Sequence, residues 1–261
     1  MSSGVQDTES PMLSFTGERI VPGMVPIGLF QEHEARYNLA RQYAKNKVVI
    51  DVACGTGIGS QHLFAGGAKK CIGLDLDEAA LEYARAEYKD CYFSACDAHD
   101  LCLADNSADL IVSFETLEHV ANPVLFLREC KRVLKRGGIL ICSTPNHTVY
   151  RWFGKNEFHK KEFTAREFRD VLSTLFTVKE LYCQKEVFYP RHVLERLTLR
   201  FIDSLGLGKK LRTILRPDAV SMSNNHVFDS MRGFNQMVGL YVPSKFWQPT
   251  YLVALALKTN S

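Results

Sequence analysis

The sequence predicts a doubly wound α/β fold with a mostly parallel sheet, and three observations support this prediction. Short apolar runs rich in β-branched residues alternate with segments of helical composition, at a spacing that favours parallel strands joined by right-handed crossovers. Glycine and proline residues separate many of these segments. The chain has 261 residues, 46% apolar and 23% charged, and this composition excludes disordered, collagen-like and coiled-coil proteins.

Seven strands are predicted, each from a short apolar or alternating run. They span residues 47–52, 70–75, 91–96, 110–114, 139–143, 176–182 and 250–258. Helices are predicted at residues 31–45, 58–65, 77–88, 122–137 and 164–175. Asp77, Asn122 and Thr164 start three of them, because their side-chain oxygens can accept hydrogen bonds from the first free backbone N–H groups. In the fourth helix the predicted apolar face consists of Val124, Leu127, Cys130 and Leu134.

The chain is predicted to form one domain at residues 31–261, preceded by an arm at residues 1–30. A helical insertion at residues 188–248 interrupts the pattern before the last strand. Residues 190–216 contain seven basic and two acidic residues. The same segment has an apolar stripe at helical spacing, formed by Leu194, Leu197, Phe201 and Leu205. Three interpretations stay open: peripheral contact with an anionic membrane, a cap that binds an anionic sugar or nucleotide, and packing on the core or in a homodimer.

Charge and cysteine content narrow the class of protein. The net charge of +3 is too small to indicate a basic surface that binds nucleic acid. The longest apolar run, residues 251–257, is far below the roughly 20 residues of a membrane span. Residues 1–17 lack the features of a signal peptide. The eight cysteines form no CxxC pair or zinc spacing, so we expect reduced thiols in a cytoplasmic protein.

The first strand leads into a glycine-rich turn, Asp-Val-Ala-Cys-Gly-Thr-Gly-Ile-Gly, at residues 51–59. Gly55 and Gly57 permit a tight turn and a close backbone approach, and the amides of the next helix face the ligand. Asp75 ends the second strand, where a carboxylate can accept hydrogen bonds from a ribose. The spacing differs from the dinucleotide motif, and the carboxylate of Asp51 suits an ammonium group better than a pyrophosphate.

These motifs resemble those of the class I S-adenosylmethionine-dependent methyltransferases, across residues 30–187. The resemblance implies a Rossmann-like sheet of seven strands with helices on both faces, an antiparallel last strand and S-adenosylmethionine as cofactor. It also implies cofactor-binding roles for Asp51, Ala53, Gly55, Thr56, Gly57, Asp75, Leu76, Asp97, Ala98 and Phe114. Asp97 and Ala98 would read the adenine, and Phe114 would line the methionine end. Arg36 or Arg19 is predicted to pair with the methionine carboxylate, since arginine binds carboxylates in a bidentate manner.

Three flanking segments, residues 16–23, 32–37 and 158–164, are similar to a bacterial subfamily associated with cell-surface polysaccharide and other glycan pathways. Their positions beside the core would let them close over cofactor and substrate. The turn after the fourth strand also lacks the N/D-P-P-Y/F sequence of amino-methylating nucleic-acid enzymes. We therefore expect a small-molecule or glycan acceptor and no nucleic-acid partner.

An alcohol acceptor requires a base to take its proton. His119, after the fourth strand, is the first candidate, and His159, after the fifth, is the second. Glu115, Glu118 and His119 form E-x-x-E-H, a pattern that some quinone O-methyltransferases use for metal. Neighbouring residues need not converge on one point, so we expect no metal.

The expected function is O-methylation of a sugar, a glycan or a related small-molecule intermediate by an S-adenosylmethionine-dependent methyltransferase. A quinone or phenolic acceptor is the first alternative. A partner or sensor protein that binds the cofactor without catalysis is the second, because the glycine-rich turn and its acids argue only for binding.

Overall fold

The computed structural model describes residues 21, 24–152, 156–204, 238–240 and 247–259. Arg19 therefore lies outside the described residues, as do Leu205 and much of the predicted insertion. The N-terminal helix α1 (Ile27–Arg41) begins four residues before the predicted start of the domain and ends four residues before the predicted end of the helix.

One sheet organises the described chain. Its strands are β1 (Val48–Val52), β2 (Lys70–Asp75), β3 (Tyr92–Ala95), β4 (Ala108–Ser113), β5 (Leu134–Pro145), β6 (Thr177–Phe188), β7 (Val238–Leu240) and β8 (Trp247–Leu257). They lie in the order β3-β2-β1-β4-β5-β8-β6-β7. β1 pairs in parallel with β2 and β4, β2 with β3, and β4 with β5, whereas β8 is antiparallel to both β5 and β6. The antiparallel last strand is thus confirmed, and β7 adds an edge strand to the predicted seven.

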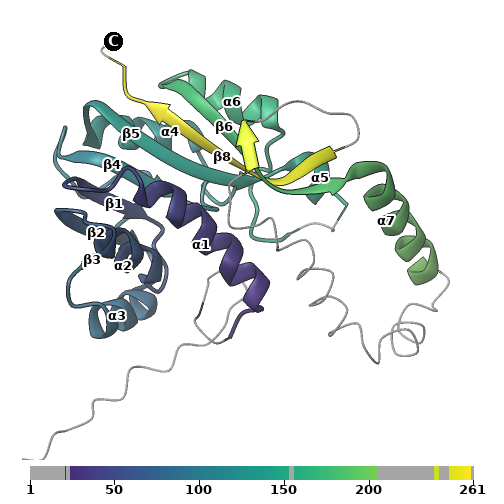
Figure 1. The fold of residues 1–261 in the computed structure, drawn as a ribbon, viewed down its shortest axis with the longest axis horizontal. Coiled ribbons are helices and arrows are strands. Elements are labelled where there is room, and N and C mark those ends of the chain that lie inside the picture. Colours follow the sequence, from purple (N-terminus) through teal and green to yellow (C-terminus); the bar gives the residue numbers. More distant parts are fainter. Residues whose placement is uncertain (1–20, 22–23, 153–155, 205–237, 241–246, 260–261) are drawn as a thin grey trace, which may run out of the picture.

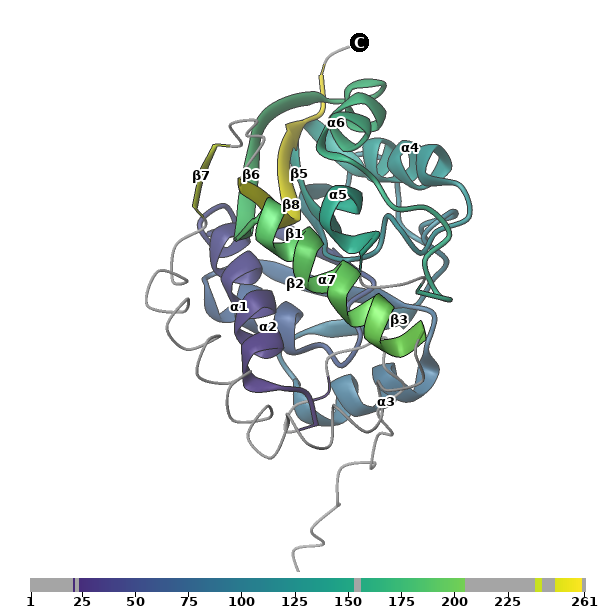
Figure 2. The ribbon, with the colours of Figure 1, turned by 90° about the vertical axis from the view of Figure 1, so that its right-hand side faces the viewer.

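Helices cover both faces of the sheet, as predicted. They are α2 (Ile58–Ala65), α3 (Glu78–Glu87), α4 (Pro123–Val133), α5 (His147–Tyr150), α6 (Ala165–Ser173) and α7 (Tyr189–Ser204). Strand alternation splits the core: Val49 packs with side chains of α1, α2 and α3, whereas the next residue, Ile50, packs with those of α4 and α6. Figure 2 shows α1 and α2 on one side and α4 and α6 on the other.

The predicted N-caps are confirmed. Asp77 accepts hydrogen bonds from Ala79 N and Ala80 N, and Asn122 accepts one from Leu125 N. Thr164 forms a capping box with Glu167.

The predicted end of the fourth helix is wrong. α4 ends at Val133 because Leu134 is already extended and pairs with Ala108 in the sheet. The buried face of α4 consists of Phe126, Leu127, Cys130 and Val133, so Val124 and Leu134 do not belong to it.

Two further features of the fold are its free cysteines and the exposed apolar side chains of α7. All eight cysteines are free, and six of them are buried. Leu194, Leu197 and Phe201 of α7 are 66%, 47% and 64% exposed, and α7 projects from the end of the sheet (Figure 1). No helix in the described part of the chain is long and apolar enough to cross a bilayer.

Candidate functional site

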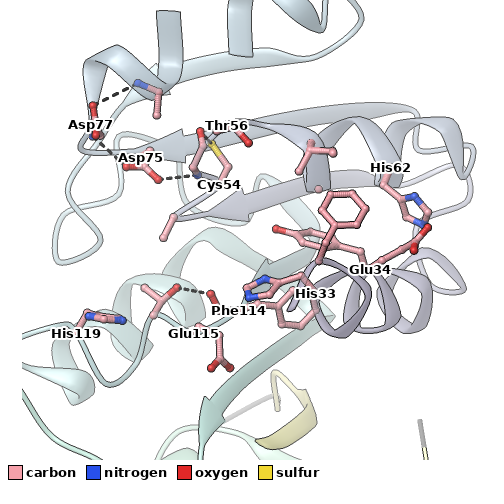
Figure 3. A pocket seen from close by; sticks show the side chains of 18 of the residues that line it. His33, Glu34, Cys54, Thr56, His62, Asp75, Asp77, Phe114, Glu115 and His119 are labelled. Carbon is pink, nitrogen blue, oxygen red and sulfur yellow. Dashed lines mark hydrogen bonds between the residues drawn. The ribbon is translucent and has the colours of Figure 1, made fainter. Parts of the chain in front are cut away.

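The carboxyl ends of β1, β2 and β4 open into one cavity of about 530 Å³. Such a volume suits a cofactor-sized ligand. In Figure 3, Cys54, Thr56 and Asp75 lie on one side of the cavity and Glu115 and His119 on the other, while His33 and Glu34 come from α1. The cavity lies at the sheet edge where the order reverses between β1 and β4, the position that open α/β sheets use for ligands.

The glycine-rich turn reaches this cavity through left-handed backbone. Ala53, Gly55 and Gly57 have φ angles of 60°, 53° and 78°. Ala53, Gly55 and Thr56 line the cavity, as predicted, but Gly57 does not. A Cβ on Gly57 would lie 2.7 Å from Ala84 Cβ and from the Phe93 ring, so this glycine lets the turn pack against α3 and β3.

Asp75 and Leu76 form the second part of the predicted wall. Asp75 Oδ2 accepts a hydrogen bond from Gly55 N at 2.7 Å, and Oδ1 accepts one from Asp77 N at 2.9 Å. Each carboxylate oxygen keeps a further acceptor site for a ribose hydroxyl. Leu76 lines the cavity and is 70% exposed, which leaves an apolar surface beside that carboxylate.

Asp51 lies beneath the turn and does not line the cavity. Its fully buried carboxylate accepts hydrogen bonds from Ser60 Oγ at 2.7 Å and from Tyr37 Oη at 3.1 Å. Burial raises the pKa of Asp51 to about 7, although both hydroxyls lower it. Because Asp51 is fully buried and does not line the cavity, its predicted direct contact with a ligand ammonium stays a prediction.

Helix α1 supplies a further wall, most of which belongs to the segment at residues 32–37 that the sequence analysis placed beside the core. Phe30, His33, Glu34 and Tyr37 line the cavity, and their spacing of three, one and three residues places them on one helical face. The Tyr37 ring packs edge-on against Phe114 with centroids 4.9 Å apart, so the predicted role of Phe114 in the wall fits. Helical spacing was the signal in the sequence that could have placed these residues on one wall. Because they differ in polarity, they form no apolar stripe that would mark this face.

The same helix turns Arg36 away from the cavity. Its fully buried guanidinium donates from Nη1 to Gln184 Oε1 at 2.7 Å and lies 4.8 Å from the centre of the Tyr251 ring. Nε and Nη2 have no hydrogen-bond partner among the described residues. Arg36 therefore links α1 to β6 and β8, and its predicted contact with a cofactor carboxylate stays a prediction.

Asp97 and Ala98 follow β3 but do not line the cavity. The Asp97 side chain is 54% exposed and accepts hydrogen bonds from His99 N at 2.8 Å and from His99 Nδ1 at 2.9 Å. These bonds lower the pKa of Asp97. The loop thus folds back on itself here, and the predicted adenine contacts stay untested.

The far wall contains the candidate base. His119 lines the cavity with its side chain 30% exposed, whereas His159 lies behind it, with ring centroids 4.9 Å apart. Glu115 also lines the cavity, in left-handed backbone with φ 52°, and Ser143 Oγ donates to its Oε1 at 2.6 Å.

The E-x-x-E-H pattern does not converge as a unit. Potential ligand atoms of Glu118, His119 and His159 lie within 4.8 Å of one another, without Glu115. The Glu115 carboxylate is bonded to Ser143 of β5, so a candidate metal set would use His159 instead.

Comparisons with known proteins agree with this geometry. Residues 50–142 match the family model for a methyltransferase domain. A protein of Mycolicibacterium smegmatis named "Probable S-adenosylmethionine-dependent methyltransferase" is 36% identical over 166 residues, which cover 62% of this chain and 64% of the relative. The chain thus spans less than two thirds of that relative.

Two further likenesses are more distant. A ubiquinone biosynthesis O-methyltransferase of Glaesserella parasuis is 26% identical over 179 residues, 52% of this chain and 75% of the relative. The solved S-adenosylmethionine-dependent methyltransferase of Mesorhizobium loti superposes with a TM-score of 0.56 at 17% identity, and covers 87% of this chain and 100% of that one. The latter likeness shows the fold.

These similar proteins are named for S-adenosylmethionine as cofactor, and the cavity fits this molecule. The left-handed turn brings the backbone of Gly55 to the wall, Asp75 offers acceptors for ribose hydroxyls, and Leu76 offers an apolar face for a base. Residues 50–142 match a methyltransferase domain, the chain is similar to a probable S-adenosylmethionine-dependent methyltransferase, and its fold agrees with that of a solved enzyme of this kind.

Proposed function

We propose that the protein transfers a methyl group from S-adenosylmethionine to a hydroxyl oxygen of a sugar, a glycan or a related small molecule. One observation carries the proposal: one cavity joins the wall at Asp75 to a partly exposed histidine, His119, on the opposite side. A protein that only bound the cofactor would need no proton acceptor there.

Bound S-adenosylmethionine supplies a methyl group already activated by its positively charged sulfur. The chain's own task is orientation and proton removal. Asp75, Leu76 and the turn at Ala53–Thr56 hold the nucleoside end, and Tyr37 and Phe114 exclude water beside it. His119 accepts the proton of the acceptor hydroxyl as the new bond to oxygen forms.

The glycan assignment of the acceptor rests on the segments at residues 32–37 and 158–164. The first lies in α1, whose Tyr37 lines the cavity, and the second contains His159, whose ring contacts His119. Both therefore border the site where an acceptor would bind, as expected of segments associated with substrate choice.

A quinone or phenolic acceptor is the second candidate. The observation in its favour is the E-x-x-E-H segment beside the cavity, together with the likeness to the ubiquinone O-methyltransferase. The third candidate, a cofactor-binding sensor or partner protein without turnover, requires only the turn and Asp75.

The test is a methyl-transfer screen over free sugars, lipid-linked glycans and phenols with radiolabelled cofactor. Transfer to a sugar hydroxyl supports the proposal, and transfer only to phenols supports the quinone candidate. Binding of the cofactor without transfer to any acceptor class would favour the sensor. Asp75→Ala provides the control for cofactor-dependent signal.

We also propose a cytoplasmic location with peripheral contact to anionic membranes through residues 190–216. Exposed Leu194, Leu197 and Phe201 support this proposal, in a segment rich in basic residues. Co-sedimentation with phosphatidylserine vesicles tests it: Leu197→Glu should abolish binding, and absence of wild-type binding would refute it. A homodimer seen by light scattering, with no vesicle binding, would assign this surface to self-association.

A further inference from the structure

The segment Glu-His-x-x-Arg-Tyr at residues 32–37 of α1 contains two pairs of residues, each four positions apart. Residues at that spacing lie on the same face of a helix, so the segment has two neighbouring faces. Glu32 and Arg36 form one face, which is buried against β6 and β8. His33 and Tyr37 form the other face, which lines the cavity.

Three of these four side chains make contacts that fix the position of α1. Arg36 donates to Gln184 Oε1, and the same amide donates from Nε2 to the carbonyl oxygen of Glu32 at 2.8 Å. The Glu32 carboxylate accepts from the lysine that follows Gln184. Tyr37 donates to the buried carboxylate of Asp51. Contacts on both sides of His33 in the chain therefore hold this part of the helix against the sheet.

His33 differs from these neighbours, because its imidazole hydrogen-bonds to no other residue in the described part of the chain. The residue is partly buried and lines the cavity. A polar ring that loses water without gaining a partner costs free energy, and a hydrogen bond to a bound ligand would offset this cost. An unpartnered imidazole in a cavity wall therefore indicates a ligand contact.

The charge state of His33 narrows the chemistry of that ligand. Burial, and then the positive charge of Arg36, lower the pKa of His33 well below its usual range, so the ring is neutral at physiological pH. A neutral imidazole has one N–H donor and one nitrogen acceptor. A hydroxyl group can bond to either nitrogen, whereas a carboxylate only accepts and an ammonium group only donates. A hydroxyl is thus the group that this ring suits best.

The position of His33 favours the methyl acceptor over the cofactor. In Figure 3, Thr56 and Asp75 lie on one side of the cavity, and His33 lies on the other side with Glu115 and His119. His33 and His119 come from different elements and lie at separate places along that side. Because His119 takes the proton of the hydroxyl that is methylated, His33 is placed to bond to a second hydroxyl.

We propose that His33 is an acceptor-binding residue that hydrogen-bonds to a second hydroxyl group of the methyl acceptor, which therefore carries at least two, as a sugar does. This inference rests on the proposed function. The acceptor oxygen bonds to the methyl carbon, the carbon–sulfur bond breaks with its electron pair on sulfur, and the hydroxyl proton passes to His119. His33 determines instead which hydroxyl of the acceptor faces the methyl group.

The test compares acceptors with several hydroxyl groups and with one. The probes are methyl α-glucoside, catechol and phenol, with radiolabelled S-adenosylmethionine. His33→Phe keeps an aromatic ring and removes both nitrogens. It should raise the KM of each polyhydroxy probe that is methylated about 5- to 50-fold with kcat little changed, because the bond is present before and during transfer. The KM of phenol should change less than about twofold, and an equal rise for phenol would overturn the inference.

Two variants serve as controls. His33→Asn keeps a donor and an acceptor, so it should recover part of the loss. Gln31→Ala is the matched control, because Gln31 is exposed on the same helix and does not line the cavity. It should change each KM less than about twofold. An unchanged urea midpoint for His33→Phe would show that its raised KM does not come from unfolding.

Histidine ring NMR of the full chain with S-adenosylhomocysteine bound detects the contact without turnover. Methyl α-glucoside or catechol should shift the His33 signals, which are identified by their loss in His33→Phe. A shift without transfer to any probe would refute the proposed function and support the acceptor contact. If His33→Phe keeps every KM and the His33 signals do not shift, the inference is overturned.

Calorimetry with S-adenosylhomocysteine distinguishes the acceptor from the cofactor. The affinity of His33→Phe should stay within about twofold of the wild type. A loss of tenfold or more would assign His33 to the cofactor and overturn the inference. If neither transfer nor a shift of the His33 signals occurs with any probe, both the proposed function and the inference are wrong.

Discussion

Gly59→Ala provides a direct test of how α1 and α2 build the cavity. Gly59 lies in the first turn of α2, and a Cβ there would lie well inside 3.0 Å of three carbons of the Tyr37 ring. The ring must therefore move by more than about 1 Å to restore ordinary contact. It has little room, because its hydroxyl donates to Asp51 and its edge packs on Phe114.

Two opposing effects determine whether Gly59→Ala lowers or raises the free energy of unfolding. Overpacking costs about 1–3 kcal/mol, whereas replacing a helical glycine by alanine gains up to about 1 kcal/mol. We expect Gly59→Ala to lower the free energy of unfolding by about 1–2 kcal/mol. In a Tyr37→Ala background only the helical gain remains, so the same substitution should become neutral or stabilising there.

Urea denaturation of the wild type, both single variants and the double variant measures this coupling, which should amount to about 1–3 kcal/mol. An equal cost of Gly59→Ala with and without the Tyr37 ring would show that the ring contact does not determine the effect.

Three further predictions concern buried and wall residues. Burial raises the pKa of Asp51 from 3.8 to about 7, so its contribution to stability is complete below pH 3.8 and is lost as the pH rises to about 7. Asp51→Asn should flatten that part of the melting-temperature profile, and an unchanged profile would contradict the assignment. Asp75→Ala should weaken cofactor binding at least about tenfold in calorimetry, because charged hydrogen bonds contribute about 1.5–3 kcal/mol; unchanged affinity would remove Asp75 from the site. Arg36→Ala should destabilise the fold by about 1–3 kcal/mol in urea denaturation, since it leaves the buried Gln184 Oε1 without its donor, and an unchanged stability would contradict this role.

The part of the cavity wall that follows β1 and β2 was largely predictable, because its sequence signals are local. The turn at residues 53–57 and Asp75 follow directly from strand ends, and parallel strands bring their carboxyl ends to one edge. Asp51 and Asp97 share that sequence logic, but their side chains bond to Tyr37, Ser60 and His99 instead. Sequence position located these carboxylates correctly on the sheet edge, although it could not decide which way each one turns.

By itself, the sequence determined the strand–helix alternation, the helix caps and the glycine-rich turn, since each depends on residues within a few positions of one another. Only the tertiary structure decided that Arg36 points to Gln184, 148 residues away, and that Glu162 links His147 to His159. It also placed Tyr37, rather than Asp51, at the cavity wall. Contacts of this kind depend on how α1 crosses the sheet and how the loops after β5 fold back. Neither of these two arrangements produces a periodic pattern in the sequence, because each depends on packing between distant segments.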